Sequence, residues 1–389
     1  MNVKQLDKEY VANTYARFPL QIANGKGSLV YDEAGKEYID LGTGIAVNTF
    51  GVSDSEWTKA VTAQLSTLQH MSNLYYTEPC TRLAKLLCEK TGMKKVFFSN
   101  SGAEANECAI KTARKYAADT KGAEYNTIVT LTNSFHGRTI TTLAATGQEV
   151  FHKDFLPLTE GFVYAEANNV SDLEAKVKEN KCAAIMLECI QGEGGVLPLT
   201  EEFVAAIKNI AEKENLLIVV DEVQTGNGRT GKLYAYMHYG LNPDIVSTAK
   251  GLAGGLPLGA TMLGERVKDT LQPGSHGSTF GGNPVCAAGA CSVLERLTDE
   301  VLAGVSEREA MIREALKGAD GVVSITGMGL MLGIETVKDA SAVIAECMQN
   351  GVLVIKAKNK VRLLPALNIP KELLQKALDV IKNACKQEN

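Results

Sequence analysis

The sequence predicts an α/β fold, with a large domain around a mainly parallel central sheet and a small α+β domain built from both ends of the chain. The middle of the chain alternates apolar strand-like runs with segments of helical periodicity, which is typical of βαβ units. Runs such as Leu216–Val220 are apolar without interruption, as expected for strands covered on both faces. The chain's 389 residues also exceed one ordinary core and favour two domains.

Each element of the large domain follows from a run of one of these two kinds. Strands are predicted at residues 94–99, 126–131, 183–188, 216–221, 244–248 and 259–264. Helices are predicted at residues 102–118, 170–180 and 200–215. Ligands bind beyond the carboxyl ends of the strands in open α/β sheets, so polar residues directly after a predicted strand are the first candidates for a site.

The two ends of the chain have a different pattern. Residues 26–40 predict a hairpin with a turn at Asp32–Lys36. Residues 295–389 alternate helices with strands at 322–326, 330–335, 352–355 and 361–364. We therefore place the large domain at residues 56–294 and the small domain at residues 1–55 and 295–389.

The composition is that of a globular protein, with 45% hydrophobic and 22% charged residues and a net charge of -5. Because no basic stripe is present, we expect neither nucleic acid nor an anionic membrane as a partner. The first residues, MNVKQLDKEY, lack the apolar region of a secretory signal, and no apolar run is long enough to span a membrane. The nine cysteines form no CxxC pair and the five histidines show no ligand spacing, which favours reduced thiols in a cytoplasm and predicts no metal site.

A lysine stands at the end of a predicted buried strand in the stretch DIVSTAKGLAGG, residues 244–255. Lysine is seldom buried unless another group pairs with it or uses it. Such an amine can bond to the aldehyde of pyridoxal 5'-phosphate (PLP), which also needs a carboxylate at its ring nitrogen and backbone N–H groups at its phosphate. Lys250, Asp221 and the helix-opening segment NSGAEAN (100–106) could supply these three groups.

The segment GNGRTG (226–231) offers a competing interpretation, because it matches G-x-G-x-x-G and follows a strand. The dinucleotide fingerprint needs its first glycine directly after the strand, whereas residues 221–225 intervene here and include two acids. Asp244 does follow at roughly the interval of the ribose-binding acid. An NAD-dependent dehydrogenase therefore stays as a remote alternative, and a cofactor-free binding protein as the option without catalysis.

Longer motifs run nearly the whole length of the chain, from GKGSLVYDEAGKEYIDLGTGIAVN (25–48) to VRLLPALNI (361–369). The central ones are NSGAEANE, SFHGRT, IQGEGG, LLIVVDEVQTGNGRTG, STAKGLAGGLPLGA and GSHGSTFGGNP. Together they resemble the class III PLP-dependent aminotransferases of fold type I, and among these the acetylornithine aminotransferases. Two features depart from the family: VNTFGVSDSEW (47–57) lacks a Gly-His-x-His-Pro element, and Cys189 stands where proline is common.

The resemblance implies how the cofactor is held. Lys250 would carry PLP and act as general base and acid, Asp221 would pair with the ring nitrogen, Phe135 would stack on the ring, and Gln224 would bond its phenolic oxygen. The phosphate would lie against Ser101, Gly102 and Ala103. Thr279 would reach the phosphate of the partner subunit, which implies a homodimer with shared active sites.

The resemblance also implies how substrates are bound. Arg138 and Arg362 are the candidate carboxylate clamps, because a guanidinium binds a carboxylate with two hydrogen bonds. Glu193 would mask Arg362 in one half-reaction and release it in the other. Further candidate contacts come from Ser278 and Tyr15, and Gly44 would leave room for an N-acyl group.

The implied reaction is transfer of the δ-amino group of N2-acetyl-L-ornithine to 2-oxoglutarate, by ping-pong kinetics, in the cytoplasm and in arginine biosynthesis. The alternatives are succinyl-diaminopimelate, ornithine and 4-aminobutyrate aminotransferases, and a racemase of the same fold.

Overall fold

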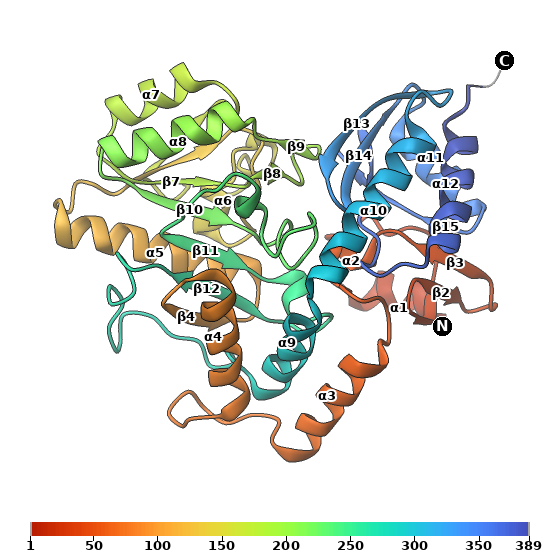
Figure 1. The fold of residues 1–389 in the computed structure, drawn as a ribbon, viewed down its shortest axis with the longest axis horizontal. Coiled ribbons are helices and arrows are strands. Elements are labelled where there is room, and N and C mark those ends of the chain that lie inside the picture. The colour runs from red at the N-terminus through yellow and green to blue at the C-terminus, as the bar shows by residue number, and fades with distance from the viewer. Residues whose placement is uncertain (1, 388–389) are drawn as a thin grey trace.

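The centre of the protein is a seven-stranded sheet, seen in a computed structural model that describes residues 2–387 (Figure 1). Its strands, in spatial order, are β4 (Lys95–Ser99), β12 (Gly259–Leu263), β11 (Ile245–Thr248), β10 (Leu217–Asp221), β7 (Cys182–Leu187), β5 (Thr127–Leu131) and β6 (Phe162–Ala165). β12 runs antiparallel to both of its neighbours, and the other six strands are parallel to one another. The mainly parallel sheet and the six predicted strands are thereby confirmed, while the edge strand β6 was not predicted.

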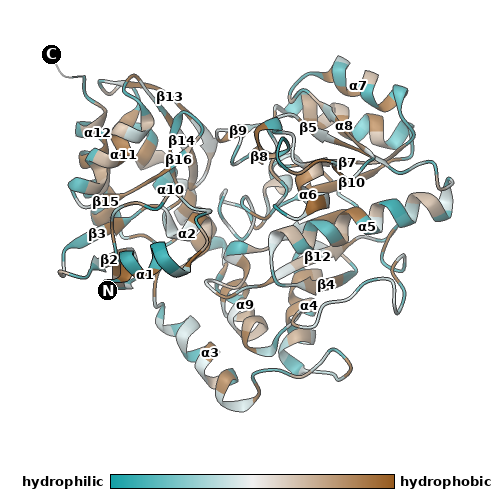
Figure 2. Ribbon diagram, turned by 180° about the vertical axis from the view of Figure 1, so that it is seen from behind, coloured by the Kyte–Doolittle hydropathy of each residue, from teal (hydrophilic) through white to brown (hydrophobic). Residues whose placement is uncertain are grey.

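Helices surround this sheet, and several of them begin at capping side chains. Those of this part are α3 (Ser55–Thr67), α4 (Glu78–Thr91), α5 (Gly102–Thr120), α6 (Ile140–Ala145), α7 (Val170–Glu179), α8 (Glu201–Lys213) and α9 (Pro284–Arg296). The side chains of Ser101, Asn169 and Thr200 each accept a hydrogen bond from the first turn of the helix that follows, which confirms the three predicted helix starts. Figure 2 shows teal and brown turns alternating along α5 and α7, as expected for helices with one buried face.

The red N-terminal and blue C-terminal elements lie together at one side of the molecule (Figure 1). One sheet there joins β1 (Ile22–Lys26), β2 (Leu29–Asp32), β3 (Glu37–Asp40) and β15 (Val352–Leu353), and a second joins β13 (Val322–Met328), β14 (Met331–Thr336), β17 (Lys360–Leu363) and β16 (Ile355–Ala357). The remaining elements are α1 (Val3–Tyr10), α2 (Thr43–Ala46), β8 (Ile190–Gln191), β9 (Leu197–Pro198), α10 (Asp299–Leu316), α11 (Ala340–Gln349) and α12 (Lys371–Cys385). The predicted hairpin forms as β2 and β3, and the pairing of β15 with β3 unites the two ends of the chain.

The segment GNGRTG is a bridge between these two parts of the protein. No α-helix follows it as a dinucleotide-binding turn requires, because residues 223–234 form consecutive turns and bends and lead only into a 3-10 turn, η2 (Ala235–His238). Arg229 is buried, and its Nη1 donates to the carbonyls of Leu330 at 3.2 Å and Pro365 at 2.5 Å. The glycines of this segment therefore allow the tight turns that bring Arg229 against the C-terminal part of the chain. The segment is not a dinucleotide-binding turn, and the dehydrogenase alternative is wrong.

No helix within residues 2–387 is long and apolar enough to cross a membrane. The same residues contain no cluster of three metal-ligating side chains, and all nine cysteines are free.

Candidate active site

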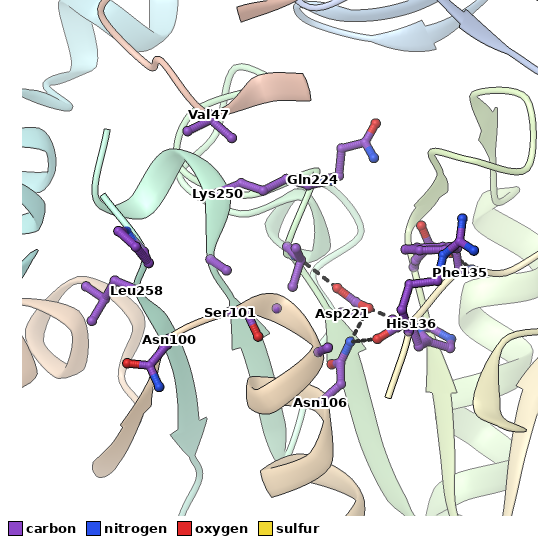
Figure 3. Close-up of a pocket in the computed structure, with 18 of the residues that line it drawn as sticks. Val47, Asn100, Ser101, Asn106, Phe135, His136, Asp221, Gln224, Lys250 and Leu258 are labelled. Atoms are coloured by element: carbon purple, nitrogen blue, oxygen red, sulfur yellow. Dashed lines mark hydrogen bonds and ion pairs between the residues drawn. The ribbon is translucent and has the colours of Figure 1, made fainter. Parts of the chain in front are cut away.

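A cavity of about 480 Å³ opens where the parallel strands end. Figure 3 shows Asp221 between Asn106 and His136, with Lys250 and Phe135 on other walls of the cavity. Its lining comprises Val47, Asn100, Ser101, Gly102, Ala103, Asn106, Phe135, His136, Gly137, Arg138, Glu188, Asp221, Val223, Gln224, Ala249, Lys250, Gly255, Leu256, Pro257 and Leu258. Eight of the residues predicted for the site, from Ser101 to Lys250, are therefore brought together on one surface.

Lys250 lies two residues after the end of β11 and opens the 3-10 turn η3 (Lys250–Leu252). Its φ of 45° lies in the left-handed region, which residues other than glycine adopt only when the surrounding structure holds them there. The Nζ atom has no hydrogen-bond partner among the described residues. Burial lowers the pKa of Lys250, Glu193 opposes this shift, and Arg362 adds to it. A shift in this direction favours the neutral amine that a nucleophile or a proton carrier requires.

The loop that follows Lys250 is supported by Trp57, the only tryptophan of the chain. Trp57 Nε1 donates to the carbonyl of Ala253 at 2.8 Å, and a Cβ on Gly254, which has a φ of 63°, would lie 3.0 Å from the same nitrogen. The segment without the Gly-His-x-His-Pro element therefore supports the loop that carries Lys250, and Val47 from the same segment lines the cavity.

Asp221 lies at the end of β10, and donors surround its carboxylate. His136 Nδ1 and Asn106 Nδ2 approach Asp221 Oδ2 at 2.8 and 2.7 Å, and the backbone N–H of Val223 donates to Oδ1 at 3.0 Å. Ser247 donates to Asn106 Oδ1 at 2.5 Å and so fixes the orientation of the amide. Burial disfavours the charged form of His136, but its hydrogen bond and ion pair with Asp221 outweigh this and raise its pKa. The carboxylate of Asp221 therefore accepts hydrogen bonds from two side chains and one backbone N–H.

The opposite end of the cavity is the N-terminus of α5. Ser101 caps the helix by accepting from Glu104 N at 3.2 Å, which leaves the N–H groups of Gly102 and Ala103 without intrahelical partners. A Cβ on Gly102 would lie 2.6 Å from Val223 Cγ1, so only glycine lets the helix start approach this wall. Free N–H groups at a helix N-terminus form a site for an anion such as phosphate.

Phe135 and Arg138 form a further wall. The backbone N–H of Phe135 donates to Glu188 Oε1 at 2.9 Å, which anchors the loop after β5. Burial, together with the charge of Asp221, raises the pKa of Glu188 to about 7. Arg138 is exposed and lies over the rings of Phe135 and Phe151, at 5.5 and 4.2 Å from their centroids. Its guanidinium forms no ion pair within the described chain, and Arg138 is one of the residues that line the cavity.

Comparison with known proteins agrees with this geometry. The class-III aminotransferase family model matches residues 10–385 of the chain.

The chain belongs to the class III aminotransferases.

Its relatives include an acetylornithine aminotransferase from Haemophilus ducreyi, 48% identical over 97% of each chain, and a succinylornithine transaminase from Citrobacter koseri, 42% identical over 97% of this chain and 96% of the relative. Among solved structures, the ornithine aminotransferase of Toxoplasma gondii superposes with a TM-score of 0.94 at 32% identity, covering 98% of this chain and 93% of that one. The N-acetylornithine aminotransferase of Stenotrophomonas maltophilia superposes at 0.85 and 34% identity, covering 98% and 97%.

The cofactor of class III aminotransferases is PLP, and the residues of this chain fit it. The cavity combines a lysine amine, a carboxylate surrounded by donors and a helix N-terminus suited to an anion. The bare Cα of Gly102 leaves this helix start open. When bound, PLP supplies an electron sink for the carbon that carries the reacting amine.

Arg362 of this aminotransferase lies on β17, in the C-terminal sheet, and is only 2% exposed. Its Nη1 is 2.6 Å from Glu193 Oε1 and 2.9 Å from Gln224 Oε1. Burial alone would raise the pKa of Glu193, but Arg362 outweighs it and holds that pKa below the usual range. The two residues do not line the cavity, but both contact Gln224, which does. The predicted partners Glu193 and Arg362 are thus paired in the structure, while masking as their role stays a prediction.

Three further predicted residues lie outside this cavity. Ser278 is next to its wall, where its Oγ accepts from Asn100 Nδ2 at 3.2 Å, whereas Thr279 is exposed. Tyr15 is 70% exposed and lines a separate cavity together with Gly44. Within one chain these three residues therefore make no wall of the site.

Sequence reasoning assigned no role to Asn106, His136, Glu188 or Val223, all of which line the cavity. Asn106 and His136 do belong to the quoted motifs NSGAEANE and SFHGRT, and Glu188 is the last residue of the predicted strand at 183–188. The missing signal was the contact with Asp221, which lies 115 residues from Asn106 and 85 from His136.

Proposed function

We propose that this enzyme transfers the δ-amino group of N2-acetyl-L-ornithine to 2-oxoglutarate in two alternating half-reactions, in the cytoplasm and as a step of arginine biosynthesis. The observation that carries the proposal is the Glu193–Arg362 pair, at 2.6 Å, beside an exposed Arg138 without an acidic partner. Acetylornithine has one carboxylate, for which Arg138 suffices. Glutamate has two, and the second needs Arg362 after Glu193 has moved aside.

The other side chains have simple tasks in this reaction. Lys250 Nζ removes the proton from the carbon that bears the reacting amine and later returns a proton, which its lowered pKa permits. Asp221 stays an acceptor toward the ring nitrogen, held by His136 and Asn106. Phe135 and Val223 present apolar walls to the ring and exclude water from it.

The preference for an acylated substrate draws support from the named relatives. Gly44 adds none within one chain, because a Cβ on it would make an ordinary contact with Val47 Cβ at 3.7 Å and because it lines the separate cavity of Tyr15. Succinylornithine is the second candidate, because a relative of that name is 42% identical to this chain.

The proposal includes a homodimer with shared active sites. Thr279 is exposed, and near it lie Phe280, Leu74 and Tyr76, which are 59%, 86% and 100% exposed. Asn73 ties this patch together by donating to the carbonyls of Ser278 and Gly281 at 3.0 and 2.9 Å. A second copy would cover these apolar side chains and bring Thr279 to the phosphate end of its partner's site. Sedimentation of Tyr76→Glu tests this, since a charge in the interface should give monomers of low activity.

The test of the activity is the visible spectrum of the purified protein, before and after addition of acetylornithine or ornithine without an oxo acid. A yellow protein that acetylornithine bleaches efficiently, and ornithine poorly, supports the proposal. Bleaching by ornithine or 4-aminobutyrate instead keeps the chemistry and overturns the substrate. Lys250→Ala is the control, because it should lack the yellow band of the attached cofactor.

A further inference from the structure

Gln224 stands between the Glu193–Arg362 pair and the cavity. Its Oε1 accepts from Arg362 Nη1 at 2.9 Å, and its Nε2 donates to Glu193 Oε1 at 3.3 Å. With the 2.6 Å contact between the two charged groups, the three side chains form a closed triangle. Gln224 alone of the three lines the cavity, which it shares with Lys250.

The backbone of Gly192 packs closely against the amide of Gln224. A Cβ on Gly192 would lie 2.6 Å from Gln224 Nε2 and 2.7 Å from its Cδ and Oε1. The backbone of Gly192 is not in the left-handed region, so its conformation does not require glycine. Glycine at this position is explained by the space that the Gln224 amide occupies.

The hydrogen-bonding capacity of this amide is limited. It has two N–H donors, of which one points to Glu193, so a single donor is left for a group inside the cavity. When a substrate carboxylate takes Arg362, Glu193 has to leave it, and the donor that Glu193 occupied is released. The amide can then give a stronger or a second hydrogen bond into the cavity.

We infer that Gln224 is a positioning residue that couples the Glu193–Arg362 pair to the cofactor end of the cavity, so that a second substrate carboxylate at Arg362 changes the hydrogen bond offered to the cofactor. The inference rests on the proposed function for the role of Arg362. It predicts the sign of the coupling. When the cofactor is bound, the N–H of Gln224 that Glu193 releases can donate to an acceptor on the cofactor. Without the cofactor, this N–H donates only to water. A dicarboxylate should therefore bind more tightly to the enzyme that holds the cofactor.

Direct electrostatics predicts the opposite sign. The cofactor is an anion and neutralises the Lys250 amine when attached, so charge alone would weaken the binding of a second anion. The sign therefore separates a relay through Gln224 from a simple effect of charge.

The experiment measures the affinity for glutarate, a dicarboxylate without a reacting amine or oxo group, by calorimetry on the PLP-loaded and PLP-free enzyme. In the wild type we expect glutarate to bind the loaded enzyme at least about fivefold tighter, a typical size for coupled sites. Gln224→Met keeps the size of the side chain but cannot donate, and should bring the ratio to about one. Gly192→Ala should also lower the ratio, because its methyl group displaces the amide.

Gln191→Met is the matched control. Gln191 is a buried amide next to Gly192 that donates to the carbonyl of Thr132 at 2.8 Å and does not touch Arg362, so the ratio should be kept. A wild-type ratio at or below one, or a ratio unchanged by Gln224→Met, overturns the inference. Circular dichroism checks that the variants fold, and if Gln224→Met does not, Gly192→Ala decides. Amino transfer from acetylornithine is assayed separately, so failure of the coupling and failure of the proposed function are distinguishable.

Discussion

Asn106 Nδ2 lies 2.7 Å from Asp221 Oδ2 and 2.8 Å from the carbonyl oxygen of His136. One amide thus ties helix α5 to the end of β10 and to the loop after β5. Both of its N–H donors are used, and Ser247 occupies its oxygen. This arrangement keeps a buried carboxylate supplied with donors at the position where a cofactor nitrogen needs an ionised acceptor.

Replacement of Asn106 by alanine should lower the free energy of unfolding by about 1–3 kcal/mol, because it leaves the Ser247 hydroxyl and the His136 carbonyl buried without partners. The affinity for PLP should fall as well. Urea denaturation and PLP titration measure the two effects. Asn209→Ala, at an exposed position of α8, serves as control and should change neither; equal stability of both variants would contradict the assigned role.

Replacement of Glu193 by alanine should unmask Arg362 permanently. The kcat/KM for glutamate should rise relative to that for acetylornithine, since a dicarboxylate no longer has to displace the partner of a 2% exposed guanidinium. Half-reaction kinetics with each amino donor measure the ratio. Glu193→Asp can still pair in part with Arg362, so its ratio of kcat/KM values should lie between those of the alanine variant and the wild type. An unchanged ratio in the alanine variant would show that Glu193 does not mask Arg362.

Glu222 should make stability depend on pH. It is fully buried and accepts from Thr225, Ala235 and Tyr236, and burial raises its pKa to about 7. A carboxyl with a raised folded pKa holds a proton that the unfolded chain has already released. The free energy of unfolding should therefore fall as the pH rises from about 5 to about 7, by up to about 1.4 kcal/mol per pH unit for this group.

Denaturant unfolding across this pH range checks the expectation. Glu222→Gln cannot titrate, so its curve should be shallower than that of the wild type, whatever its absolute stability. Glu212→Gln, at an exposed position of α8, should keep the wild-type slope. Parallel curves for Glu222→Gln and the wild type would refute the assignment.

Gly44 sits in a run of four residues with positive φ, from Thr43 at 47° to Ala46 at 62°. Its own φ is 64°, so Gly44→Ala should lower the free energy of unfolding by roughly 1 kcal/mol through backbone strain alone. Gly44→Asn should cost less, because asparagine adopts this conformation more readily. Thermal unfolding of the two variants gives the comparison, and a larger cost for asparagine would contradict a conformational origin.

Most of the central sheet could be predicted because its strands are buried along their whole length, as β7, β10 and β12 are. β6 was not predicted because it is a four-residue edge strand with partly exposed side chains. α3 has no buried residue, so its sequence carries little of the apolar periodicity that predicts a helix. Elements that form because they pack against distant segments cannot be predicted from the pattern of neighbouring residues.

The same distinction holds for the site. Lys250 and Asp221 could be predicted because Asp221 ends one strand of the sheet and Lys250 lies just after another, and their chemistry is specific to few cofactors. The structure added a different kind of information, namely which groups share one atom. Gln224 was expected to serve the cofactor alone, yet both ends of its amide contact the Glu193–Arg362 pair. Such shared bonds depend on side-chain rotamers from three separate segments, which no spacing rule contains.

The pairing of Ile39 on β3 with Val352 on β15 has a consequence for how the protein is made. A ribosome finishes β3 about 300 residues before it reaches β15, which at ordinary elongation rates is a delay on the order of 15–60 s. During that time the outer edge of β3 offers unpaired backbone groups that can join another nascent chain. The N-terminal strands should therefore be the part of this enzyme most in need of chaperone protection during synthesis.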